Sequence, residues 1–185
     1  MIKRVFFLFL ILSSLLLARN YDQTIIDIES KLFPKMALLE KRVEKSSSPY
    51  LNISIVANEM DFDVAQGFKT NIESSYPNAM LNKKIITKVI RFEDLKTQTP
   101  DAIIVLHDSK ETLRAIASWA NERKIVSFAY DPSYLEDGFL ASIYIEKSTK
   151  PYLNAQVIKK FGFIFNTYLL RLSKFKTNGK QDVKE

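Results

Sequence analysis

The sequence predicts an α/β fold: a three-layer sandwich in which a mostly parallel sheet of about five or six strands carries helices on both faces. Two apolar, β-rich runs, residues 102–106 and 125–129, flank residues 109–124, where apolar side chains recur at helical spacing. A strand, a crossover helix and a strand form a βαβ unit, and its parallel sheet has to be covered on both faces. A third apolar run follows at residues 139–145 and extends the same sheet.

The N-terminal half adds helices and strands to this unit. Residues 21–45 carry one apolar stripe, which predicts an amphipathic helix, and Pro34 inside it is expected to kink or divide that helix. Residues 51–57 form an apolar strand, and residues 63–76 a helix that ends before a proline. Residues 84–92 alternate β-branched and basic side chains, which predicts a strand near the edge of the sheet.

The C-terminal third predicts a hairpin and two helices. Residues 151–154 are expected to pair back on the strand at 139–145. A helix then begins at Ala155 and is broken at Gly162, and residues 166–175 carry the leucines of a final helix. The count is thus about five or six strands and four helices.

The chain divides into four segments. Residues 1–18 have the basic, apolar and small-residue order of a secretory signal peptide, and their apolar run is shorter than the roughly 20 residues that span a bilayer. An uncleaved membrane anchor is the alternative. Residues 19–48 form the N-terminal amphipathic helix, residues 49–176 the α/β domain, and residues 177–185 a polar tail. Export to the periplasm is therefore expected.

Composition limits the chemistry of the protein. The chain has no cysteine, which excludes disulfides and thiolate metal sites. Its formal charge of +6 falls to +4 if the two basic residues of the signal leave, and the remaining excess is spread along the chain. Nucleic acid is not an expected partner, because its binding requires a concentrated basic stripe. The four glycines are too far apart for a phosphate-binding loop, so we expect no nucleotide or other cofactor.

One stretch could bind a ligand. His107, the only histidine, follows a predicted strand and precedes Asp108 and Ser109, at the end where open α/β sheets bind ligands. Asp131 follows the next strand in the same way. The alternative is that Asp108, Ser109 and Asp131 cap the helices that follow them. No catalytic triad or multi-histidine metal site is present in the sequence, so we expect a protein that is not an enzyme.

The C-terminal residues carry a recurring pattern. Gly138 opens the strand-forming run FLASIYI, and Leu153-Asn154 is followed eight residues later by Gly162. The polar pair Asn166-Thr167 and the leucines Leu169 and Leu170 complete it. In this order and spacing, residues 51–174 resemble the YfiR-like family of periplasmic proteins (the DUF4154 domain). The chain departs from that family in three respects. Only one glycine of its double glycine is present, and the cysteines that some members use for redox control are absent. The segment around residues 32–35 also differs from the aromatic-rich opening helix of the family.

The resemblance implies a regulatory function. The best-known members hold an inner-membrane diguanylate cyclase inactive by binding its periplasmic sensory domain, which lowers cyclic-di-GMP output. The leading hypothesis is therefore a non-enzymatic periplasmic regulator whose partner is an inner-membrane diguanylate cyclase or a sensor kinase. Association of the chain with a second copy of itself, as a homodimer, is left as an open alternative. The alternative is a periplasmic small-ligand binding protein that uses the strand ends at residues 107–109 and 131. The alternative for Asn154 and Gly162 is a purely structural role. The Asn154 side chain would then hold a turn in place, and Gly162 would supply a backbone conformation that favours glycine.

Overall fold

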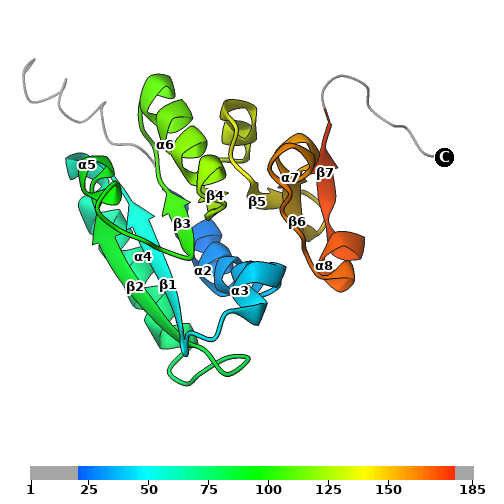
Figure 1. Cartoon of the computed structure of the whole chain (residues 1–185). Helices are drawn as coiled ribbons and strands as arrows, with labels where there is room; N and C mark the ends of the chain where they lie inside the picture. Colours follow the sequence, from blue (N-terminus) through cyan, green and yellow to red (C-terminus); the bar gives the residue numbers. More distant parts are fainter. Residues whose placement is uncertain (1–20, 178–185) are drawn as a thin grey trace, which may run out of the picture.

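The computed structural model describes residues 21–177 (Figure 1). The helices of this part are α2 (Gln23–Leu38), α3 (Lys41–Lys45), α4 (Phe62–Ser75), α5 (Phe92–Leu95), α6 (Lys110–Glu122), α7 (Ala155–Phe161) and α8 (Thr167–Leu172). The strands are β1 (Tyr50–Val56), β2 (Lys84–Ile90), β3 (Ala102–Val105), β4 (Val126–Ala129), β5 (Ala141–Ile145), β6 (Thr149–Asn154) and β7 (Lys174–Lys176). Two 3-10 helices, η2 (Glu59–Asp61) and η3 (Pro132–Asp137), complete the order. The predicted signal peptide, residues 1–18, lies outside the described residues.

The strands of the described chain form one seven-stranded sheet in the order β2-β1-β3-β4-β5-β6-β7. Neighbouring strands from β2 to β5 are parallel, β5 and β6 are antiparallel, and β6 and β7 are parallel. The fold class predicted from the sequence is confirmed, as are the edge position of β2 and the hairpin of β5 with β6. Along the sheet, β1 is followed by β2 in one direction, and β3 is followed by β4 in the opposite direction. The strand order therefore reverses between β1 and β3.

Both faces of the sheet are buried, because alternate residues of each central strand point to opposite sides. On β3, Ala102 and Ile104 belong to one apolar core, and Ile103 and Val105 belong to the other. The first core packs beneath α2 and α4, and the second packs beneath α6. Figure 1 shows α4 behind β1 and β2, with α6 on the opposite side of the sheet. The sandwich therefore has three layers.

Helix α2 is an integral part of the first core. The Phe33 ring stacks on Phe128 of β4, with centroids 4.5 Å apart, and on Phe68 of α4 at 6.3 Å. All three rings are fully buried. Pro34 does not divide the helix, because α2 continues through it and ends at Leu38.

The helix ends at Leu38 because Glu40 starts a new one. The buried Glu40 carboxylate accepts hydrogen bonds from the backbone N–H groups of Arg42 and Val43, at 3.0 and 3.3 Å, and so caps α3. Its other oxygen accepts from the N–H of Ile164 at 3.4 Å. Glu40 thereby joins the α2–α3 corner to the segment that leads into α8, a long-range contact that helical periodicity does not reveal.

The C-terminus also differs from the prediction. The final helix was expected over residues 166–175, whereas α8 ends at Leu172 and residues 174–176 form β7 along β6. This strand is short, and Lys174 and Lys176 flank a single apolar residue, so its sequence carries no strand pattern. Its place in the sheet is set by the neighbouring strand.

Gly67 and Gly162 differ in conformation, which gives a matched pair of variants. Gly162 ends α7 with φ +70°, whereas Gly67 lies inside α4, and a Cβ at either position meets no atom within 4 Å. Gly162→Ala is expected to lower the free energy of unfolding by about 1 kcal/mol through left-handed strain. Gly67→Ala should raise it by about 0.5–1 kcal/mol through helix propensity. Urea unfolding of both variants measures whether each change lowers or raises the free energy of unfolding. Equal destabilisation by Gly67→Ala and Gly162→Ala would contradict the left-handed conformation as the cause.

Candidate functional site

The carboxyl ends of β1, β2 and β3 surround a pocket of about 430 Å³, which we name the switch-point pocket. It lies where the strand order reverses, the place at which open α/β sheets bind their ligands. Its volume is within the range of small-molecule sites. The lining residues follow β1, β2 and β3 in turn: Ala57, Asn58, Glu59, Arg91, Phe92, Glu93, Asp108 and Thr112.

Asn58 ties together the two strands that flank the reversal. Its side-chain amide donates to the backbone carbonyl of His107, which follows β3, at 2.9 Å, and to the Asp61 carboxylate at 3.0 Å. Its side-chain oxygen accepts from the N–H groups of Met60 and Asp61 and caps η2. Every polar atom of the Asn58 side chain is thus used to fix the floor of the pocket.

The walls of the switch-point pocket are predominantly acidic. Glu59, Glu93 and Asp108 bring three carboxylates, and Arg91 brings one guanidinium, which is paired with Glu59. Arg91 and Glu59 are both exposed, so this ion pair contributes little to stability. Because the carboxylates outnumber the cation, the electrostatics of the pocket favour a ligand that carries positive charge or hydrogen-bond donors.

His107 is enclosed by an aromatic cluster of Tyr21, Tyr130 and Tyr134. Its ring lies 5.0, 5.5 and 5.6 Å from their respective ring centroids. Its Nδ1 shares a hydrogen bond with the Tyr134 hydroxyl, and its backbone N–H donates to the Tyr21 hydroxyl at 3.1 Å. The histidine singled out from the sequence therefore forms the edge of a packed cluster beside the pocket and does not line the pocket itself.

The other residues predicted at this edge have separate roles. Asp108 lines the switch-point pocket, and its carboxylate accepts from the N–H of Ser109 at 2.6 Å. Ser109 caps α6 through the N–H of Thr112, at 3.2 Å. Asp131 caps η3 through the N–H of Ser133, at 2.8 Å. The structure thus places one of the four predicted ligand residues, Asp108, in the pocket wall and gives two of them the capping role.

The lining residues missed by sequence reasoning are Ala57, Asn58, Glu59, Arg91, Phe92, Glu93 and Thr112. Residues 57–59 directly follow β1, and residues 91–93 directly follow β2. The sequence did carry a signal for these residues, namely their position after the predicted strands, because the carboxyl ends of parallel strands meet at one edge of a sheet. Using it required knowing that β1 and β2 are neighbours in the parallel part of the sheet.

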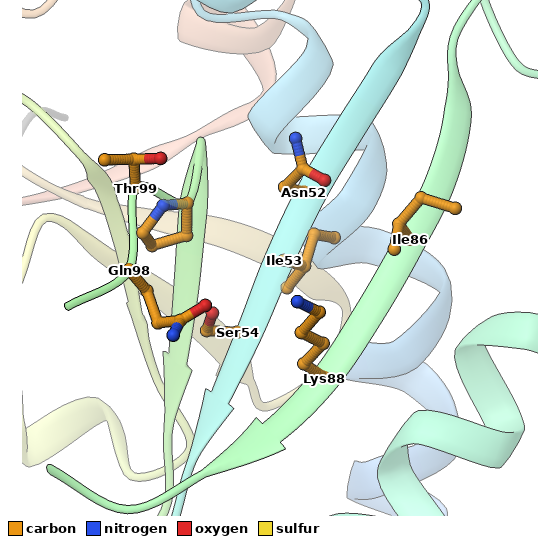
Figure 2. A pocket seen from close by; sticks show the side chains of 8 residues that line it. Asn52, Ile53, Ser54, Ile86, Lys88, Gln98 and Thr99 are labelled. Atoms are coloured by element: carbon orange, nitrogen blue, oxygen red, sulfur yellow. The ribbon is translucent and has the colours of Figure 1, made fainter. Parts of the chain in front are cut away.

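A second depression lies halfway along the strands (Figure 2). Asn52, Ile53 and Ser54 of β1, Ile86 and Lys88 of β2, and the loop residues Gln98, Thr99 and Pro100 line it. Its volume is about 190 Å³, below the range of ordinary ligand sites. It marks the part of the sheet face that the loop between α5 and β3 covers only partly, and we regard the switch-point pocket as the better candidate.

The residues of the family-like pattern hold turns in place. Gly138 ends η3 with φ +103°, and Gly162 ends α7 with φ +70°. The Asn154 side chain caps α7 through the N–H of Val157 at 3.2 Å and donates to the carbonyl of Leu135 at 2.9 Å. Leu169 is buried and Leu170 half-buried in the first core. Each of the five residues therefore has a structural role.

One buried acid lies near the aromatic cluster. Glu29 of α2 is 1% exposed, and its Oε2 has no hydrogen-bond partner. Burial, with a smaller contribution from the nearby Asp131 carboxylate, raises the pKa of Glu29 well above its ordinary value of 4.5. Burial likewise raises the pKa of the Tyr130 hydroxyl. The fold thus favours the neutral form of the Glu29 carboxyl over its charged form.

Two features are absent from the described residues. No group of three His, Cys, Asp or Glu side chains within residues 21–177 is placed to hold a metal ion. No helix in that range combines the length and apolar character needed to cross a bilayer.

Comparisons with known proteins bear on the fold. No protein-family model matches the sequence, and no curated protein matches it. Among solved structures, a conserved domain protein from Vibrio cholerae O1 biovar El Tor is similar, with a TM-score of 0.55, 14% identity and coverage of 81% of this chain and 59% of that one. An ABC domain from Streptococcus pneumoniae, solved in complex with L-Trp, gives a TM-score of 0.49, 14% identity and coverage of 76% and 61%. The chain spans about three fifths of each, and the first likeness supports the α/β fold alone.

The buried Glu29 makes stability depend on pH. A carboxyl whose pKa is raised in the fold stays protonated there while the unfolded chain ionises, so the free energy of unfolding falls as the pH rises above about 4.5, by up to about 1.4 kcal/mol per pH unit. Glu29→Gln removes this loss. Urea unfolding at pH 4 and pH 7 should find the variant more stable than the wild type at pH 7 and close to it at pH 4. An equal difference at both pH values would contradict the raised pKa.

Proposed function

We propose that the protein is a non-enzymatic binding protein that takes a small, positively charged or donor-rich ligand in the switch-point pocket. The observation that carries this proposal is the position of the pocket at the reversal of strand order, with side chains from three strand ends converging on it. The acidic excess of the lining supports a cationic ligand. A periplasmic location is part of the proposal and rests on the signal-like sequence of residues 1–18.

Rigid support around the pocket strengthens the proposal. Ligand sites are largely pre-formed, and sites held by a packed scaffold lose less entropy on binding. Here the Asn58 bridge between η2 and His107 fixes one side of the floor. The Ser109 cap fixes the start of α6 on another side. The side chains of Glu93 and Arg91 are both exposed, and Arg91 is paired with the exposed Glu59.

The first experiment is a thermal-shift titration with putrescine, a small dication. Putrescine is expected to raise the melting temperature in a concentration-dependent way, because a ligand that binds the folded state stabilises it. Glu93→Gln should weaken the effect about tenfold, since it removes one lining carboxylate. Asp94→Asn is the matched control, because Asp94 lies next to Glu93 in α5 but does not line the pocket. Equal losses in both variants, or no shift with putrescine at all, would contradict a cation site here.

A second function is favoured by exposed apolar side chains in the family-like segment. Tyr168 and Leu172 lie one turn apart on α8 and are 68% and 48% exposed, whereas Leu169 on the same helix is buried. Exposed apolar groups of this kind are typical of protein-binding surfaces when they occur together. We propose as the alternative that this face of α8 contacts the periplasmic domain of an inner-membrane diguanylate cyclase or sensor kinase. Binding would favour one state of a two-state receptor and so lower its output.

Capture from detergent-solubilised inner membranes tests this alternative. The wild-type chain is expected to retain a diguanylate cyclase or a sensor kinase, identified by mass spectrometry. Tyr168→Ser should reduce the recovery several-fold, because it removes the most exposed aromatic ring of α8. Tyr50→Ser is the control, since Tyr50 is also an exposed tyrosine, 47%, at the start of β1. Retention of such a receptor to the same extent by both variants would exclude the α8 face.

A further inference from the structure

The hollow drawn in Figure 2, which we name the β1–β2 depression, is lined by residues 52–54, 86, 88 and 98–100. Ile53 of β1 belongs to the first core, so its neighbours Asn52 and Ser54 point to the other face of the sheet. Val56 shares that face and belongs to the second core. The depression therefore lies on the sheet face opposite α2 and α4, and it shares no lining residue with the switch-point pocket.

The lining of the depression includes a buried hydroxyl group without a protein partner. Ser54 is 4% exposed, and its hydroxyl makes no hydrogen bond to another group within residues 21–177. In that part of the chain, the unpartnered side-chain atoms that are closed to solvent belong to Glu29, Ser30 and Asn121. The Ser54 oxygen is not among them, so it is open to the depression that Ser54 lines. Because buried polar groups are almost always paired, this hydroxyl needs a partner from outside the chain, either water or a ligand.

A lysine stands beside this hydroxyl. Ser54 of β1 and Lys88 of β2 are partners in the parallel register, so their side chains leave the same face of the sheet next to each other. Figure 2 shows the Lys88 ammonium directed from β2 toward β1. Lys88 forms no ion pair within the described residues. The Asp101 carboxylate accepts from the backbone and side-chain N–H groups of Asn52, at 2.8 and 3.3 Å, and does not line the depression. The lining thus carries one positive charge and no negative charge.

The loop between α5 and β3 completes the lining with neutral groups, residues 98–100. Figure 2 shows the Gln98 side chain directed toward β1. Its amide nitrogen donates to the Thr97 hydroxyl at 3.3 Å, and an amide carries a second N–H that can donate to a ligand. Ile86 of β2 and Pro100 add apolar surface.

We propose that the β1–β2 depression binds a small carboxylate with a short apolar chain. One lysine balances one negative charge, which matches a monoanion better than a doubly charged phosphate. The Ser54 hydroxyl and the Gln98 amide donate to the carboxylate oxygens, and hydrogen bonds to an ionised acceptor are stronger than those between neutral groups. Ile86 contacts the apolar chain. The volume of about 190 Å³ restricts the ligand to a few carbon atoms.

Propionate and propionamide, which are close in size and differ in charge, test the ligand class on the full chain. In ¹H–¹⁵N spectra, propionate should give saturable shifts of the amides of residues 52–54, 86–88 and 98–99, with the weak affinity expected of so small a ligand. Propionamide should bind at least about tenfold more weakly, since it has no charge to pair with Lys88. Equal shifts with the two compounds, or no saturable shift up to about 50 mM propionate, would overturn the proposal.

Two variants locate the site. Lys88→Gln should weaken propionate binding about tenfold, whereas Lys84→Gln should leave it unchanged, because Lys84 is exposed on the same strand but lies outside the lining. Ser54→Ala should weaken binding about fivefold without lowering the melting temperature, because the hydroxyl that it removes has no protein partner. Equal losses in Lys88→Gln and Lys84→Gln, or a lower melting temperature of Ser54→Ala, would contradict the proposal. Propionate binding should persist in saturating putrescine, so the two sites can fail independently.

Discussion

Burial of both faces of a parallel sheet is the constraint on which the rest of this structure depends. A parallel strand needs a crossover to reach its neighbour, and the crossovers α4 and α6 leave from the same carboxyl edge toward opposite faces of the sheet. Where they diverge, between β1 and β3, the strand ends are not covered by either helix. The switch-point pocket at that position is therefore a consequence of the topology, and the side chains that line it come from the segments that follow β1, β2 and β3.

The same constraint explains why one residue holds the pocket together. Asn58 lies between β1 and η2, as the residue that caps η2, and its amide reaches the carbonyl of His107, which follows β3. Backbone groups at strand ends need partners when they are not in the sheet. A short amide side chain satisfies three of them at once.

Local sequence patterns predicted most of the fold but little of the site. The apolar runs of β1, β3 and β4 and the helical face of Leu113, Ile116, Ala117 and Ala120 were sufficient to predict the three-layer sheet, because each element buries its own periodic face. Pro34 was misjudged because the break is imposed by Glu40, whose partner Ile164 is distant in the sequence. Strand β7 was missed because pairing with β6 determines it. The pocket walls depend on strand order, which no single segment encodes, so only Asp108 was identified in advance.

Mapping a bound cation on the ¹H–¹⁵N spectrum of the protein tests the central claim most directly, because it reports position independently of affinity. If the reversal of strand order creates the ligand site, putrescine will shift the amides of residues 57–59, 91–93 and 108–112, and the amides along β6, α7 and β7 will stay unchanged. Shifts confined to another region, or spread evenly over the acidic surface, would contradict the account.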